Sequence, residues 1–81
     1  MYFVYMLLCG DRTLYTGITT DIKRRLAEHK EGKGGRYTRA REISRLLYSE
    51  TQPTRSAALK REAAIKKLTR REKLALAKQK L

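Results

Sequence analysis

The feature that most constrains the fold is an unbroken apolar run from Tyr2 to Cys9, which ends at the turn-forming residues Gly10-Asp11-Arg12. The run is too short to cross a bilayer, and its aromatic and branched side chains predict a buried strand. The segment from Thr13 to Gly17 is predicted to be a second short strand. Because turn residues separate the two segments, together they should form an antiparallel hairpin.

A helix is predicted to follow the hairpin. Thr20 or Asp21 can cap its N-terminus, and the helix carries Ile22 and Leu26 at helical spacing before it ends at the glycines around Lys33.

The second half of the chain is predicted to contain one strand and two helices. Leu46-Leu47-Tyr48 suits a strand, and Thr54 introduces a helix that runs to about Leu68. Thr69 and Glu72 form a Thr-x-x-Glu capping box for a third helix. The predicted fold class is α+β: a small three-stranded antiparallel or mixed sheet flanked by helices, in the order β-β-α-β-α-α. Residues 1–81 should form a single domain, with residues 69–81 as a basic C-terminal helix.

Charge indicates the class of partner. The chain carries a formal net charge of +12, and 35% of its residues are charged. This imbalance excludes an enzyme for small cationic substrates and favours an anionic partner, nucleic acid first and anionic membrane second. On charge alone, a ribosome-associated or merely soluble basic protein fits as well as a DNA enzyme. The single Cys9 and the single His29 allow neither an internal disulfide nor a Cys/His zinc cluster, which favours a reducing, cytoplasmic location.

Basic residues gather in two places that can contact nucleic acid. One is a predicted loop with an embedded aromatic residue, and the other is the end of the second helix. The candidate contacts are Arg36, Tyr37, Thr38, Arg39, Lys66 and Lys67.

Glu62 falls within the apolar stripe of the second helix, between Leu59 and Ile65. A half-buried carboxylate is costly unless it is paired or bound to metal, so this position is a candidate site. The structural alternative is an ordinary ion pair with Lys66, one turn further on.

Two further pairs of polar residues could carry chemistry. Arg25 and His29 lie one turn apart on the first helix, where a guanidinium matches phosphate oxygens and an imidazole exchanges a proton near neutral pH. Each could instead be a solvated base or a helix-terminal cation. Tyr5 and Tyr15 lie on paired strands, where phenols can order an attacking water or simply pack.

These residues in this order resemble the GIY-YIG endonuclease domain over nearly the whole chain, and within it the small stand-alone bacterial proteins. The resemblance is carried by Val4-Tyr5, Tyr15-Thr16-Gly17, Arg25, His29 and Glu62. The segments at residues 34–39 and 58–62 resemble the branch of the family that cuts branched DNA. The chain departs from the family pattern in both motifs: the first reads Phe3-Val4-Tyr5 where the family has Gly-Ile-Tyr, and the second reads Tyr15-Thr16-Gly17, so that only the tyrosines and the glycine are kept. It also has Ile18 where some members have lysine.

The resemblance implies a metal-dependent endonuclease that acts on DNA in preference to RNA. Tyr5 and Tyr15 would position or deprotonate the attacking water, Arg25 would hold the scissile phosphate, and His29 could relay a proton. Glu62 would be the sole protein carboxylate on Mg²⁺ or Mn²⁺, whose other ligands are water and phosphate oxygens. Gly17 would let the backbone approach the site closely.

In this hypothesis Arg25 and Glu62 face the two tyrosines across a shallow cleft. The alternative is a non-catalytic nucleic-acid-binding module that keeps the nuclease fold and contacts phosphates through Arg36, Arg39, Arg41, Lys60, Lys66, Lys67, Arg70 and Arg71. A third hypothesis has residues 69–81 dock on anionic lipid, but their apolar residues are few and none is aromatic, so no membrane partner is expected. The sequence leaves the oligomeric state open.

Overall fold

The computed structural model describes residues 1–31 and 43–79 of the chain. Its elements are the strands β1 (Tyr2–Cys9), β2 (Leu14–Thr19) and β3 (Ile43–Gln52), and the helices α1 (Ile22–Lys30), α3 (Arg55–Lys66) and α4 (Arg70–Gln79). They follow the predicted order β-β-α-β-α-α, and the α+β fold class is confirmed. The predicted loop contacts Arg36, Tyr37, Thr38 and Arg39, and the glycines predicted to end the first helix, lie outside the described residues.

The sheet has the strand order β2-β1-β3, and both pairings are antiparallel. Of the two sheet types predicted, the antiparallel one is therefore present. The strand β1 lies in the centre, which explains why its sequence is apolar at nearly every position rather than at alternate ones. Side chains of a strand alternate between faces, so Val4 and Met6 lie on one face of the sheet and Tyr5 and Leu7 on the other. All four are at most 1% exposed.

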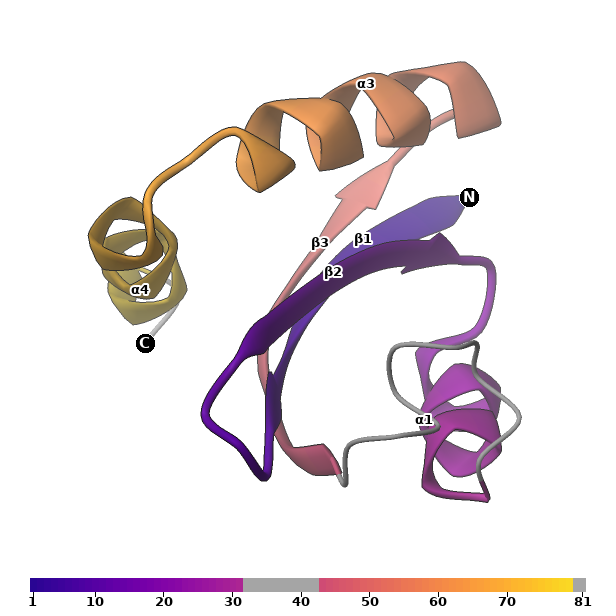
Figure 1. Cartoon of the computed structure of the whole chain (residues 1–81). Helices are drawn as coiled ribbons and strands as arrows, with labels where there is room; N and C mark the ends of the chain where they lie inside the picture. Colours follow the sequence, from indigo (N-terminus) through magenta and orange to yellow (C-terminus); the bar gives the residue numbers. More distant parts are fainter. Residues whose placement is uncertain (32–42, 80–81) are drawn as a thin grey trace.

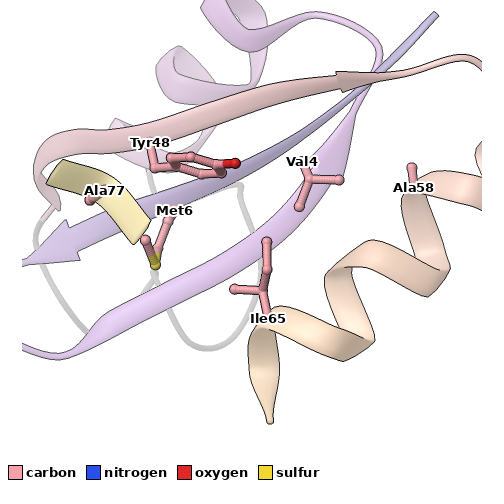
Figure 2. Close-up of a cluster of buried hydrophobic side chains, with 6 residues drawn as sticks. All are labelled: Val4, Met6, Tyr48, Ala58, Ile65 and Ala77. Atoms are coloured by element: carbon pink, nitrogen blue, oxygen red, sulfur yellow. The ribbon is translucent and has the colours of Figure 1, made fainter. Parts of the chain in front are cut away.

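Helices cover both faces of the sheet. Val4 and Met6 pack with Tyr48 of β3, with Ala58 and Ile65 of α3, and with Ala77 of α4 (Figure 2). On the opposite face lies α1 (Figure 1). No helix in the described part of the chain is both long enough and apolar enough to span a bilayer.

Side-chain caps fix where the helices begin. Of the two predicted caps for α1, Asp21 is the one used, because its Oδ1 accepts the backbone N–H of Arg24 at 3.0 Å. The predicted capping box of α4 is also present: Thr69 N–H donates to Glu72 Oε1 at 2.9 Å, and Glu72 N–H donates to Thr69 Oγ1 at 3.2 Å. Local sequence alone therefore determines these two helix starts.

A half-buried polar network ties α3 to β3. The Nε of Arg61 donates to both carboxylate oxygens of Glu50 at 3.0 Å, Gln52 Nε2 donates to Oε2 at 2.7 Å, and the Tyr48 hydroxyl donates to Oε1. The Glu50 side chain is only 13% exposed. Because one carboxylate accepts bonds from a helix and from its own strand, the network fixes how α3 is oriented on the sheet.

Glu50→Gln tests the stabilising effect of this network. Burial alone would raise the pKa of Glu50, but hydrogen bonds from Tyr48, Gln52 and Arg61 together with the Arg61 charge hold it below its usual value. Such a group stabilises the fold above its unfolded-state pKa of about 4.3, and this stabilisation is lost as the pH falls through the lower folded-state pKa. We expect the substitution to reduce the free energy of unfolding at pH 7 by about 1–3 kcal/mol.

Urea unfolding of both proteins at neutral pH and again well below pH 4 measures this difference. The difference in the free energy of unfolding between the wild type and Glu50→Gln should become smaller in acid. A difference of the same size at both pH values would show that the charge of the Glu50 carboxylate does not cause it.

Candidate active site

Two tyrosines and a glycine share the α1 face of the hairpin. Tyr5 pairs with Gly17, and Leu7 pairs with Tyr15, so all these side chains point the same way. The centroids of the Tyr5 and Tyr15 rings lie 6.2 Å apart. A Cβ atom on Gly17 would lie 2.7 Å from Tyr5 Oη and 3.0 Å from Tyr15 Cε2. Residue 17 must therefore be glycine for both rings to lie over β2.

His29 comes from α1 and completes this group of rings. Its Nε2 and the Tyr5 hydroxyl form a buried hydrogen bond of 2.9 Å. The imidazole also meets the Tyr15 ring edge-on, with centroids 5.3 Å apart, and the residue is only 2% exposed. Although His29 lies in the last turn of α1, where a cation would favour the helix terminus, its ring instead packs against both phenols, which also contact each other.

Arg25 lies one turn before His29 on the same helix and remains partly open to solvent. Its Nη1 forms an ion pair of 3.0 Å with Glu28 Oε1, and its side chain is 29% exposed. The guanidinium also interacts with the Tyr5 phenol. Arg25 therefore offers a partly exposed cation beside a cluster in which Tyr5 and His29 are buried and Tyr15 is half-buried. Glu28 was not singled out from the sequence, although its i,i+3 spacing from Arg25 is the signal for such a pair.

Burial and charge determine the protonation of the cluster. Burial raises the pKa of Tyr5 to about 12, even though hydrogen bonding and charge from Arg25 act against the shift. Burial, and then the charge of Arg25, lower the pKa of His29, while Glu28 has the opposite effect. At neutral pH, the hydrogen bond therefore joins a neutral phenol to a neutral imidazole. Such an imidazole can accept a proton because one of its nitrogens is free of hydrogen.

Glu62 lies on α3, which packs on the sheet face opposite α1 (Figure 1). Its side chain is 19% exposed and forms an ion pair with Lys66 Nζ at 3.5 Å, the structural alternative considered from the sequence. The structure thus brings Tyr5, Tyr15, Arg25 and His29 together and places Glu62 on a helix across the sheet. Because α3 also packs on the edge strand β2, the shortest way between the two positions is around that edge.

Few side chains in the described part of the chain could act together as ligands to a metal ion. Among residues 1–31 and 43–79, no three His, Cys, Asp or Glu side chains converge on one point. A cation that requires a protein cage does not fit. A lone half-buried carboxylate fits Mg²⁺ or Mn²⁺ that keeps most of its waters and takes substrate oxygens.

The phosphate contacts predicted for the binding module include Lys60 on α3 and Arg70 and Arg71 on α4, which are exposed, whereas Arg41 lies outside the described residues. The other two in the described part of the chain, Lys66 and Lys67, lie at the C-terminal end of α3. Lys66 and Lys67 are both exposed there. Gly17 is buried beneath the tyrosine rings, so the close approach that it permits is between the rings and its own strand.

Comparison with known proteins identifies the family. Residues 1–75 match the GIY-YIG catalytic domain. The chain belongs to the GIY-YIG family. Its GIY-YIG relatives include a UPF0213 protein of Streptococcus sanguinis, 52% identical over 95% of this chain and 88% of the relative. Another is a UPF0213 protein of Haloquadratum walsbyi, 49% identical over 96% of this chain and 88% of the relative.

Two solution NMR structures share the GIY-YIG fold described here. One is the UPF0213 protein BH0048 of Bacillus halodurans, with a TM-score of 0.62, 42% identity, and coverage of 99% of this chain and 86% of that one. The other is protein EF2693 of E. faecalis, with a TM-score of 0.65, 44% identity, and coverage of 96% of this chain and 83% of that one. The chain thus resembles the small stand-alone GIY-YIG proteins, as expected from its motifs.

The single histidine makes the electrostatics of this GIY-YIG site directly measurable, because its ring protons titrate without overlap. We expect Arg25→Gln to raise the pKa of His29, since the Arg25 charge lowers it, and Glu28→Gln to lower it further. Proton NMR titration of the wild type and the two variants checks the direction of both pKa shifts. Shifts in the same direction in the two variants would show loosening of the cluster instead of loss of specific charges.

Gly17→Ala tests whether the rings need the space above β2. Both rings would have to move, so we expect the free energy of unfolding to fall by roughly 1–3 kcal/mol. The pKa of His29 should also move as its hydrogen bond with Tyr5 opens. Gly10→Ala, in the exposed hairpin turn, is the matched control. A Gly17→Ala protein with wild-type stability and an unchanged His29 titration would contradict this role.

Proposed function

We propose that this protein is a metal-dependent endonuclease that hydrolyses phosphodiester bonds in DNA, with branched or damaged DNA as the preferred substrate. The observation that carries the proposal is the convergence of Tyr5, Tyr15, Arg25 and His29, from three separate elements, at one position. The preference for DNA, and for branched DNA in particular, rests on the motif resemblance. The chain has a single cysteine, Cys9, and therefore no internal disulfide, which supports a cytoplasmic location.

Arg25 is the residue that holds the scissile phosphate. Its guanidinium stays charged at all physiological pH values, and its fork of N–H donors matches two phosphate oxygens. The partial exposure of the side chain leaves it accessible to a large substrate. The bond to Glu28 restrains the guanidinium, so Arg25 is oriented before a phosphate arrives.

Tyr5 and His29 remove the proton from the attacking water. A phenol with a pKa of about 12 is a poor base alone, but its hydrogen bond to a neutral imidazole provides an acceptor. In this step the water gives a proton to Tyr5 Oη as the phenolic proton passes to His29 Nε2, so the second ring nitrogen, Nδ1, must carry the hydrogen of the neutral ring. The water oxygen then bonds to phosphorus, the bond from phosphorus to the leaving sugar oxygen breaks, and solvent protonates that oxygen.

Glu62 would hold the divalent cation. When bound, Mg²⁺ or Mn²⁺ would supply positive charge to the leaving oxygen. A phosphate that interacts with both Arg25 and Glu62 would have to lie at the β2 edge, because α1 and α3 occupy opposite faces of the sheet. Glu62 is available for this role because its observed partner, Lys66, is 56% exposed and holds it through a single long contact.

A non-catalytic nucleic-acid-binding module is the second candidate. The position of Glu62 across the sheet from the phenols favours it, since a binding module has no use for a carboxylate near the cluster. The net charge of +12 suits either function.

Cleavage of branched and nicked DNA distinguishes the two candidates. With Mg²⁺, the wild-type protein should give discrete products, and Arg25→Ala and Glu62→Ala should each reduce the rate by at least about 100-fold. A matched control should keep the activity: Lys23→Ala removes an exposed charge from α1, the helix that carries Arg25.

Gel analysis of end-labelled substrates measures these rates. Full activity in Arg25→Ala and Glu62→Ala would reject the mechanism. Tight binding by the wild-type protein with no product under any divalent cation would instead establish the binding module.

A further inference from the structure

A basic hollow lies between the β1–β2 turn and the first turns of α4, outside the tyrosine cluster. It is lined by Thr13, Leu14, Arg70 and Lys73 and has a volume of about 210 Å³. The two cations come from a helix that lies more than fifty residues after the turn in the sequence. Chain segments that are distant in sequence therefore build this feature together.

A direct contact holds the two sides of the hollow together. Arg70 Nη1 donates to the backbone carbonyl oxygen of Arg12. Arg12 itself has a φ of 69°, a left-handed conformation that is unfavourable for a residue with a Cβ. The turn is stabilised by Asp11, whose Oδ1 accepts the N–H of Thr13 at 3.1 Å and its hydroxyl at 2.6 Å. The hollow thus has walls that are fixed without any ligand.

The chemistry of the hollow suits a phosphate group. One N–H of the Arg70 guanidinium is used by the carbonyl of Arg12, and a guanidinium has five in all. The ammonium of Lys73 has three donors, and within the described part of the chain it forms no ion pair with a carboxylate. Of the acids close in sequence to the lining residues, Asp11, two residues before Thr13, is engaged with the turn, and Glu72, next to Lys73, with the N-terminal cap of α4. Two cations therefore face the hollow with donors to spare.

The hollow and the cluster of Tyr5, Tyr15 and His29 rings lie close to each other along the edge strand β2. Thr13 immediately precedes the edge strand β2, and Tyr15 lies two residues further on, about 7 Å along the strand. This corresponds to about two steps of a nucleic acid strand at ~3.4 Å per step. A backbone that crosses the edge of β2 can therefore reach both places.

We propose that this hollow binds a backbone phosphate of the nucleic acid, a few nucleotides from the phosphate held by Arg25. Lys73 and Arg70 form the binding site, and its role is to set the register of the substrate along β2. The inference rests on the proposed function only in requiring that the protein bind nucleic acid. It does not require cleavage, and nothing in it involves Glu62.

Binding of a fluorescein-labelled DNA duplex, followed by anisotropy in EDTA over a range of salt concentrations, tests the proposal. EDTA prevents cleavage, so only binding is measured. Loss of one phosphate contact should reduce the slope of log Kd against log salt by about 0.9. We expect Lys73→Gln to show this reduction and to weaken binding several-fold at about 0.1 M salt, and Lys73→Arg to restore both.

Lys78→Gln is the matched control. It removes the same charge from the same helix, but Lys78 lies beside Arg71, Leu74 and Ala75 in a different hollow. We expect it to change the slope by less than half as much as Lys73→Gln. Because Lys73 is half-buried whereas Lys78 is exposed, the melting temperatures of both variants are compared with that of the wild type, and unchanged values exclude misfolding as the cause.

Each outcome separates this inference from the proposed function. If the wild-type protein binds the duplex and Lys73→Gln has a wild-type slope, the hollow is not a phosphate site, and the proposed function stands. Equal losses of affinity and of salt slope in Lys73→Gln and Lys78→Gln would also overturn the proposed phosphate site, because they would reflect general attraction of DNA by a basic helix. A wild-type protein that binds neither duplex nor branched DNA would overturn both proposals.

Discussion

The burial of β1 on both faces is the constraint on which the rest of the structure depends. Val4, Tyr5, Met6 and Leu7 are at most 1% exposed, although the domain is small and has little interior to share. A strand that is apolar on both sides must be covered on both sides, which places α1 against one face and α3 with α4 against the other. The same strand therefore supplies the hydrophobic cluster to one face and a phenol to the other.

This division explains how a small domain can hold a polar cluster without losing its core. The large apolar cluster lies on the α3 face, so Tyr5 and His29 need not contribute to it. They satisfy each other by a hydrogen bond of 2.9 Å, and a buried polar pair that is fully satisfied carries little penalty. Gly17 makes this possible, since any side chain on that residue would occupy the space of the rings.

Much of the fold follows from local sequence, whereas the relation of elements across the sheet does not. The apolar run predicts β1 with its observed limits, and Asp21, Thr54 and Thr69 cap the helices that they were expected to cap. The third strand, Ile43–Gln52, extends well beyond the predicted Leu46-Leu47-Tyr48. Its polar residues Glu50 and Gln52 carry no local strand signal, because the partner of the Glu50 carboxylate, Arg61, lies eleven residues further on in α3.

The candidate site shows the same limit more clearly. Hairpin pairing and the i,i+4 spacing on a helix are local rules, and they anticipate that Tyr5 lies near Tyr15 and Arg25 near His29. The apolar stripe of α3 indicates which side of that helix meets the sheet, but it carries no information about which face of the sheet is met. The position of Glu62 opposite the phenols is therefore a tertiary fact, and no periodicity in the sequence contains it.

Glu50 and Glu62, on the α3 side of the sheet, differ in what holds their carboxylates, and this difference bears on the chemistry. Glu50 is bound by Arg61, Tyr48 and Gln52 and is 13% exposed. Recruiting it to a metal would leave the buried Tyr48 phenol and the partly exposed Arg61 guanidinium without their partner. Glu62 has one long ion pair with a lysine that is more than half exposed, a contact worth about 0–1 kcal/mol. A cation or a substrate could displace that lysine at little cost. Within the part of the chain that the structure describes, Glu62 is therefore the carboxylate of this pair that can change partners. In the proposed function, the edge of β2 is where such a change would meet a phosphate bound to Arg25.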